Sequence, residues 1–316
     1  MARNLVAAFL AVAALLAGCS PDAGPKSRAA RLPAGAVVVR DDAGRTVRLA
    51  MHARRVVSLV PSVTEAIVAM GSSERLVGRT RYDTAPEVRD LPSVGGGLDP
   101  SLEAVVALRP DLVIGWDAAG YRGLRPGLEA SGIPLYAVRV EDTTDVYRAF
   151  ERLGELLGLP VEAGRAAGTL RDSLAAVAAA SLPGGRPTVF YALLGDPPRT
   201  AGPRTFIGQL IRIAGGEPAF PDLAGDWPEV SLEAVLTRRP DVIVVPEGQG
   251  IPGVERLAQR PGWGELEAVR ERRVVAVPAD LFSRPGPHLG KAARALERAL
   301  AGIWPPDTTV RKGGAR

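Results

Sequence analysis

The sequence predicts an α/β protein of two lobes with mostly parallel sheets, joined by a rigid long α-helix, with a ligand cleft between the lobes. Three observations support this prediction. Short apolar runs alternate with helical patterns in both halves of the chain, which is typical of parallel sheets covered by helices. The segment from Asp145 to Ala180 shows helical patterns only. One helix–strand unit occurs twice, as SLEAVVALRPDLVIGW from Ser101 and as SLEAVLTRRPDVIVVP from Ser231, so each lobe is expected to be Rossmann-like.

The two copies of this unit are too far apart for a solenoid repeat. They are separated by 130 residues (231 − 101) and match without a gap, so Glu103 corresponds to Glu233 and Pro110 to Pro240. Solenoid repeats recur every 20–50 residues, roughly. A chain of 316 residues with 46% hydrophobic content can build two cores. The duplication therefore predicts two similar lobes.

The first 19 residues have the pattern of an export signal. Arg3 precedes an unbroken apolar run with a small-residue ending, and the run is too short for a confident membrane span. Its end, Leu-Ala-Gly-Cys, resembles a bacterial lipobox, and Cys19 is the only cysteine in the chain, so we expect Cys19 to carry lipid. The alternative is a plain signal peptide that happens to end in Cys. Residues 20–35 are polar and rich in Pro and Gly, as in a flexible tether.

Residues 36–143 are predicted to form the N-terminal lobe, which begins with a hairpin around the turn Asp-Asp-Ala-Gly. Ser62 and Glu65 have the spacing of a capping box, which predicts that a helix begins at Ser62. The other elements follow from apolar runs for strands and helical spacing for helices. In chain order we expect a strand at 56–60, a helix at 62–71, a strand at 75–80, a helix at 102–108, a strand at 112–116, a helix at 121–131 and a strand at 133–140.

Residues 144–184 are predicted to form a helical connection, and residues 185–303 the C-terminal lobe. Pro160 interrupts the connection, which predicts a short helix and then a long one at about 161–180. A helical connection is stiffer than a Gly/Ser linker, so the cleft should open only to a limited extent. In the second lobe we expect strands at 187–195, 242–246 and 272–278, helices at 205–216, 231–238 and 290–301, and a tail at 304–316.

The sequence offers few residues for catalysis. There are two histidines, His52 and His288, and no G-x-S-x-G motif, so neither a Ser-His-Asp triad nor a three- or four-ligand metal site is expected. GPHLGK superficially suggests a phosphate loop, but Ala follows Lys291 where a P-loop has Ser or Thr. Basic and acidic residues nearly balance (39 against 35) and are interleaved, which argues against nucleic-acid binding. We expect a binding protein without catalytic residues, metal or cofactor, and a lipid-anchored hydrolase is the alternative.

Ligands of open parallel sheets bind beyond the carboxyl ends of the strands. Those ends are rich in Gly and Pro with a few aromatic and charged side chains, a mixture that suits a wide pocket for a large, partly polar ligand. They fall at residues 61–62, 80–85, 95–99, 116–117, 195–202, 225–227, 246–250 and 278–287.

Glu103 and Glu233 lie in the first turn of the two repeated helices. One interpretation is structural, because a carboxylate in the first turn interacts favourably with the helix dipole. The other is that two acidic points, one in each lobe, bind a symmetric basic partner. The residues alone leave both interpretations open.

Several long segments resemble one family in order along the chain. RVVSLVPSVTEAIVAMG, LPSVGGGLDPSLEAVVALRPDLVIGW, TFIGQLIRIAGGEPAF, WPEVSLEAVLTRRPDVIVVP and ADLFSRPGPHL are similar to solute-binding proteins of ABC importers, in the clade for cobalamin, haem and ferric siderophores. The resemblance covers residues 37–301. It implies a lipid-anchored protein facing the periplasm or the cell exterior, capture of a small molecule between the lobes, and delivery to a permease dimer. It also implies that Glu103 and Glu233 dock against permease arginines.

Within this clade the segments YDTAPEV, LPSVGG, DWPEVS and SRPGP look most like cobalamin binders. Gly97 and Arg199 stand where the best-known cobalamin pattern has aromatic residues, and two flat apolar contacts for a corrin are lost there. The alternative ligands are haem and a ferric siderophore, whose carboxylates arginine could hold. Besides these two positions, the resemblance implies ligand-facing residues at Pro61, Ser62, Tyr82, Trp227, Asp280 and Arg284.

The first prediction concerns the anchor. Replacing the expected acylation site with Cys19→Ser should leave the protein soluble or as an unprocessed precursor, because acyl chains hold proteins at bilayers by burying methylene groups. Fractionation of cells that express the variant measures this. A correctly cleaved variant that still sediments with membranes would contradict the lipobox interpretation.

Overall fold

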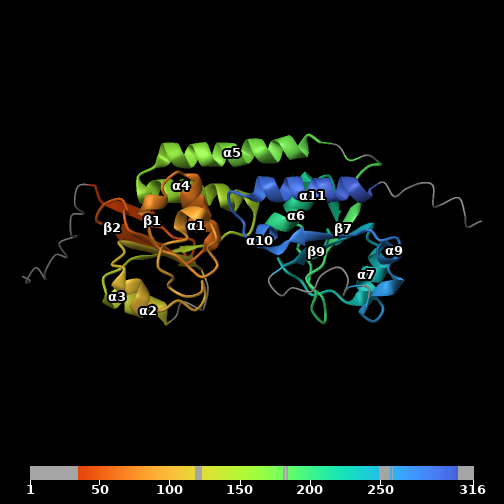
Figure 1. Ribbon diagram of the computed structural model, residues 1–316, viewed down its shortest axis with the longest axis horizontal. Coiled ribbons are helices and arrows are strands. Elements are labelled where there is room, and N and C mark those ends of the chain that lie inside the picture. The colour runs from red at the N-terminus through yellow and green to blue at the C-terminus, as the bar shows by residue number, and fades with distance from the viewer. Residues whose placement is uncertain are drawn as a thin grey trace, which may run out of the picture. The chain divides into compact units, whose positions relative to one another are not determined.

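The computed structural model describes residues 35–117, 123–180, 182, 184–248, 257 and 259–304, and this part of the chain has an α/β fold (Figure 1). It contains two four-stranded parallel sheets and one antiparallel hairpin, which confirms the predicted fold class. No helix in these ranges has both the length and the apolar character needed to span a bilayer. The expected export signal, Cys19, most of the tether and almost all of the tail lie outside the described residues.

The N-terminal lobe is built on a sheet with the strand order β4-β3-β5-β6. The hairpin β1–β2 is held beside this sheet, since Asp42 donates its backbone N–H to the carbonyl of Ala137 in β6. The central strand β3 is fully buried. The elements are β1 Val37–Arg40, β2 Thr46–Leu49, β3 Val56–Ser58, α1 Pro61–Ala69, β4 Leu76–Gly78, α2 Leu102–Ala107, β5 Leu112–Trp116, α3 Leu124–Ala130 and β6 Leu135–Val138, with short 3₁₀ helices at Ser73–Arg75 and Pro86–Val88.

The predicted capping box at Ser62 is wrong. Helix α1 begins at Pro61, and its N-cap is Val60, which has no side-chain oxygen to cap the helix. Proline is favoured at the first helical position because its fixed φ suits the helix and its missing N–H costs nothing there. Ser62 is therefore already inside the helix, and Glu65 does not reach back to the cap. The predicted end is close, because Met70 is the C-cap and Gly71 has a positive φ of 71°.

The C-terminal lobe is built on a sheet with the strand order β10-β9-β7-β8. Its strands β7 and β9 contribute Phe190, Ile243 and Val245 to a second buried cluster, in which Phe190 packs against the rings of Phe220 and Trp263. The sequence analysis missed β8, α9 and α10, which are too short to show a period. The elements are β7 Thr188–Tyr191, α6 Phe206–Ile213, β8 Glu217–Pro218, α7 Leu232–Arg238, β9 Val242–Glu247, α9 Glu267–Arg270, β10 Val274–Pro278, α10 Ala279–Phe282 and α11 Leu289–Ile303, with a 3₁₀ helix at Trp263–Glu265.

Two helices connect the sheets. They are α4, Thr143–Leu157, and α5, Pro160–Ala178, so the first is longer than the short helix predicted before Pro160. Figure 1 shows α5 alongside α4 at one end and α11 towards the other, and α5 contacts both helices and α6. The approach of α11 is close, because a Cβ on Gly290 would lie 2.0 Å from Ser173 Oγ. One long helix is thus packed against elements of both lobes.

The repeated unit has the same local structure in both lobes. Ser101 caps α2 by accepting a hydrogen bond from the N–H of Ala104, and Ser231 caps α7 in the same way. After each helix one residue takes a left-handed conformation, Arg109 with a φ of 46° and Arg239 with a φ of 48°. A non-glycine residue in this conformation is uncommon. The repetition therefore extends from the sequence to the backbone.

The aspartates of the repeated unit also have equivalent roles. Asp111 accepts hydrogen bonds from the backbone N–H groups of Arg54 and Arg55, just before β3. Asp241 accepts from the N–H and the hydroxyl of Thr188, at the start of β7. Each aspartate precedes one strand of its sheet and binds the start of the adjacent strand. The duplicated sequence is therefore a structural unit that aligns two neighbouring parallel strands.

We expect Asp241→Ala to lower the free energy of unfolding by about 1–3 kcal/mol, because the partly buried Thr188 N–H and hydroxyl lose their acceptor. Denaturant-induced unfolding measures the change. Asp222→Ala is the matched control, since Asp222 is an exposed carboxylate paired with Arg238 and its removal should have little effect. Equal effects of the two substitutions would contradict the strand-alignment role.

Candidate functional site

A cavity of about 190 Å³ lies beyond the carboxyl ends of strands from both sheets. Trp116 ends β5, Tyr82 follows β4, and the segment that contains Arg284 follows β10. The structure thus brings together five of the eight residues that the sequence analysis proposed for ligand binding. The full lining is Pro61, Ser62, Tyr82, Trp116, Asp280, Ser283 and Arg284.

The first turn of α1 contributes a polar group to this cavity. Ser62 is only 4% exposed, and its Oγ has no hydrogen-bond partner among the described residues. A buried hydroxyl without a partner costs free energy, which a ligand acceptor or donor would recover. The N-terminal end of a helix also carries a partial positive charge. This corner of the cavity is suited to a polar group of a ligand.

Arg284 forms the opposite side of the cavity and connects the two lobes. Its Nη1 donates to Oε1 of Glu65 in α1 at 3.0 Å, and its Nη2 donates to the carbonyl of Tyr82 at 2.9 Å. Asp280 Oδ1 lies 3.8 Å from Nη2. The turn that follows Arg284 also packs closely on α1, since a Cβ on Gly286 would lie 3.1 Å from the Cβ of Ser62. Arg284 is therefore held in place by partners from the other lobe.

A second, larger cavity of about 490 Å³ shares Asp280 and Arg284 with the first. Its lining also includes Glu65, Glu87, His288 and Lys291. Of the described residues, His288 and Lys291 line the larger cavity and not the smaller one, where Arg284 is the only arginine or lysine.

Tyr82 is the more exposed of the two aromatic residues that line the cavity, with 44% of its surface accessible. The guanidinium of Arg81 lies 5.2 Å from the centroid of its ring, within the range of a cation–π contact. Side-chain hydrogen bonding with Tyr82, and then with Asp99, raises the pKa of Arg81 above its ordinary value. Arg81 thus interacts with Tyr82 and Asp99, and Tyr82 also lines the cavity.

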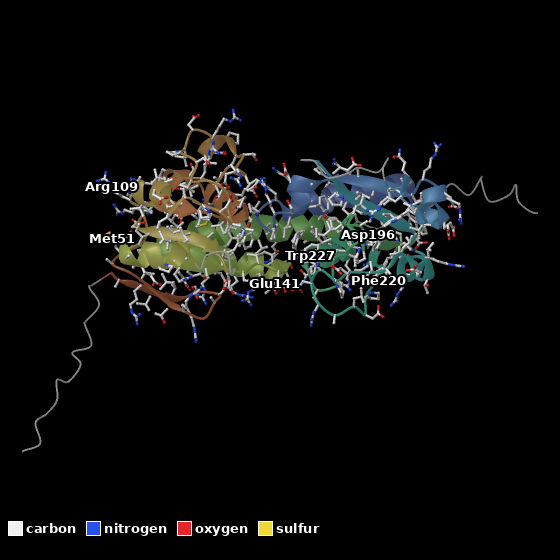
Figure 2. The ribbon with its side chains drawn as sticks, turned by 90° about the horizontal axis from the view of Figure 1, so that it is seen from below. Met51, Arg109, Glu141, Asp196, Phe220 and Trp227 are labelled. Atoms are coloured by element: carbon white, nitrogen blue, oxygen red, sulfur yellow. The ribbon has the colours of Figure 1, made fainter. Side chains whose placement is uncertain are left out.

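Three of the predicted ligand-binding residues do not line this cavity. Trp227 is 37% exposed and packs edge-to-face on Phe206, with the ring centroids 6.2 Å apart. Phe206 in turn donates its N–H to the carbonyl of Glu141, and Figure 2 shows Trp227 and Glu141 near the junction between the lobes. Arg199 forms an ion pair of 2.9 Å with Glu229. Their roles towards a ligand stay predictions.

Gly97 is the third predicted ligand-binding residue that does not line the cavity. It is buried and has no room for a side chain. A Cβ there would lie 2.7 Å from the carbonyl oxygen of Leu59, close to the end of β3. The next residue, Leu98, is instead 63% exposed. Leu98 and Trp116 lie in two of the predicted carboxyl-end segments, 95–99 and 116–117, but neither was selected as a ligand-facing residue, although the position of Trp116 at a strand end was a usable signal.

Four arginines in the loops beyond the strands are paired with carboxylates. The pairs lie in both lobes, and two acidic partners, Asp99 and Asp117, come from other carboxyl-end segments than the arginines they bind. Each guanidinium contributes hydrogen-bond donors, but its positive charge is balanced by a neighbour. The pairs are Arg81 with Asp99, Arg139 with Asp117, Arg199 with Glu229, and Arg284 with Glu65.

Glu103 and Glu233 are exposed in the first turns of α2 and α7. The pKa of each carboxyl is lowered by hydrogen bonding to the backbone, and further by the hydroxyl of Ser101 or Ser231. Both side chains are therefore ionised at neutral pH and in equivalent surroundings. The structural interpretation of these residues is supported, and the same geometry presents one negative charge on each lobe.

The histidines lie apart from one another. His52 makes a contact of 3.0 Å from Nδ1 to the carbonyl of Glu155, and His288 lines the larger cavity. Within the described ranges, no group of three or more His, Cys, Asp or Glu side chains is placed to hold a metal ion.

Comparison with known proteins gives consistent matches. The model of a family described as periplasmic binding protein matches residues 56–281. An uncharacterized ABC transporter substrate-binding lipoprotein of Bacillus subtilis is 30% identical over 313 residues, covering 96% of each chain. A vitamin B12-binding protein of Vibrio parahaemolyticus is 29% identical over 238 residues, covering 74% of this chain and 84% of its own. A solved periplasmic heme-binding protein from Roseiflexus is 30% identical with a TM-score of 0.68, covering 79% of this chain and 98% of its own.

Proposed function

The chain belongs to the periplasmic binding protein family, and we propose that it captures cobalamin and delivers it to the permease of an ABC importer. It is a substrate-binding protein of an ABC importer of the vitamin B12, haem or siderophore type, and proteins of this family carry substrates for transport rather than catalyse reactions. It acts outside the cytoplasm. Anchoring through Cys19 is part of the proposal and is supported by the lipoprotein relative.

The balance of charge around the cavity is the observation that favours cobalamin. The periphery of a corrin carries neutral carboxamides, each of which needs both donors and acceptors, whereas haem carries propionate groups. Ser62 and Arg284 can donate hydrogen bonds here, and Asp280 can accept them. Arginines that are already paired with carboxylates supply donors without a net positive charge. Such a site fits an uncharged, amide-bearing ligand better than a dianionic one.

The aromatic residues add to this argument. Tyr82 and Trp116 both line the cavity, and flat rings bury flat apolar ligands effectively. A corrin is larger than a cavity of 190 Å³, so in our proposal only one edge of the ligand enters it. The exposed side chains of Leu98 and Trp227 would then contact the remainder.

Haem is the second candidate, and one observation favours it. Tyrosine is one of the side chains that hold haem iron in proteins, and the exposed ring of Tyr82 borders the cavity. The similarity to the Roseiflexus heme-binding protein points the same way. A ferric siderophore would need cationic groups for its anionic donors, which the paired arginines supply less readily.

Calorimetric titration of the purified protein with cyanocobalamin should show binding with a micromolar or lower Kd, or about −8 kcal/mol or better. Tyr82→Phe should preserve this binding because the ring remains. Haem should bind more weakly, and any coordination of its iron should disappear in Tyr82→Phe. The absence of heat with cyanocobalamin, together with tight haem binding that depends on the Tyr82 hydroxyl, would replace cobalamin by haem.

The proposal includes docking of the two lobes to a permease dimer through Glu103 and Glu233. The support is structural equivalence, because the two carboxylates have the same cap, the same exposure and the same local hydrogen bonds. A partner with two-fold symmetry presents two equivalent basic sites. Opposite charges across such a contact favour association, and like charges oppose it.

We expect the double charge reversal Glu103→Arg with Glu233→Arg to abolish ligand uptake while the affinity for the ligand stays at the wild-type value. Neither residue is part of the lining of the cavity, so capture should be unaffected. Uptake, affinity and thermal stability are measured in the same variant. Asp172→Arg, a reversal at an exposed position of α5, is the matched control. Wild-type uptake by the double variant would leave the two glutamates with a structural role only.

A further inference from the structure

We propose that Glu65 determines which ligands the smaller cavity accepts, by neutralising Arg284 so that carboxamides are preferred over carboxylates. This inference rests on the proposed function and assigns a role to a residue that does not line the smaller cavity. Glu65 thus acts through Arg284 and is a positioning residue. Its effect on the ligand is electrostatic and geometric.

The pair is well shielded from solvent. The Glu65 side chain is 11% exposed, the Arg284 side chain is 14% exposed, and Oε1 lies 3.0 Å from Nη1. Electrostatic interactions of charges in such surroundings are stronger than at the surface. The other carboxylate oxygen, Oε2, is buried and has no hydrogen-bond partner among the described residues. Arg284 therefore provides the hydrogen bonding that the structure shows for this carboxylate.

Among the described residues, Arg284 is the only cation that lines this cavity. Asp280 is the only other charged residue of the described lining, and its Oδ1 is 3.8 Å from the guanidinium. Arg81 is bound to both oxygens of Asp99, and Lys291 lines only the larger cavity. A ligand carboxylate beside Arg284 would thus meet two carboxylates, Glu65 and Asp280, around one guanidinium.

The guanidinium still has donors to offer. Arginine carries five N–H groups, and the hydrogen bonds to Glu65 and to the carbonyl of Tyr82 use two of them. The remaining N–H groups can bind the carbonyl oxygen of an amide. The same amide can donate its N–H to Asp280 or to Ser62 Oγ, which has no hydrogen-bond partner among the described residues. A carboxylate has no proton to donate to these acceptors, so only the amide can bind both the donors of Arg284 and the acceptors Asp280 and Ser62.

The test compares two pairs of ligands that differ in charge but little in shape. One pair is cyanocobalamin and its isomeric monocarboxylates, in each of which one peripheral amide is replaced by a carboxylate. The other pair is haem and its dimethyl ester. The ratio of Kd values within each pair is measured at pH 7 for the wild type, Glu65→Gln and Glu65→Asp. The isomers are tested separately, because only the amide beside Arg284 should show the preference.

We expect the wild type to bind the neutral form more tightly than the carboxylate, by on the order of tenfold. In Glu65→Gln this preference should disappear or reverse, because Arg284 loses the nearer of its two carboxylates and keeps the more distant Asp280. Glu65→Asp should retain part of it, since the negative charge remains. Glu87→Gln removes the same charge from the larger cavity without contact to Arg284, and it should keep the wild-type ratio. A merely structural role of Glu65 would change both Kd values of a pair together.

The wild-type ratio alone can overturn the inference, whatever the variants do to folding. Equal or tighter binding of the carboxylate form by the wild type would overturn it, and so would a preference that Glu65→Gln leaves unchanged. Either result is compatible with cobalamin or haem as the ligand. Binding of neither pair would overturn the proposed function and this inference with it.

Discussion

The ion pair between Arg284 and Glu65 holds the described part of the site together. It joins the turn before α11 to α1 in the other lobe, and Arg284 also bonds the backbone beside Tyr82. If one partner of a shielded pair is removed, the other is left as an uncompensated charge, which is strongly unfavourable. The cavity walls contributed by α1, the β4 loop and the β10 loop therefore keep their relative positions through one guanidinium.

The duplicated unit aligns parallel strands, and it also places an exposed glutamate at the equivalent position of each lobe. Each copy needs a serine cap, a left-handed arginine and an aspartate that binds the neighbouring strand, because these features align two parallel strands. The glutamate in the first turn contributes to the same helix start. Since both lobes keep the whole unit, both also present an exposed carboxylate at the equivalent place. These two carboxylates would give a partner with two-fold symmetry two equivalent binding sites.

Much of the fold could be predicted because alternating apolar runs and helical patterns are local signals. The prediction of a capping box failed because the roles of Ser62 and Glu65 are set by other residues. Pro61 takes the first helical position, and the partner of Glu65 is 219 residues away (284 − 65). No local pattern reveals such a contact, and conflicts of this kind are expected at functional sites. The resemblance named Pro61, Ser62, Tyr82, Asp280 and Arg284 as ligand-facing, and the structure places all five around one cavity, but the resemblance could not show that Gly97 has no space for a side chain.

The same pair also explains why arginine is suited to position 284. The residue must hold the lobes together and still donate to a ligand, and a planar group with five N–H donors can do both. A lysine has three donors at a single point, so bonds to Glu65 and to the carbonyl of Tyr82 would use most of them. The contact between the lobes and the hydrogen bonds to the ligand thus both depend on the side chain of Arg284, and Glu65 allows Arg284 to do both. Its ion pair with Arg284 neutralises the guanidinium and joins the two lobes, and the remaining N–H groups of Arg284 can bind the ligand.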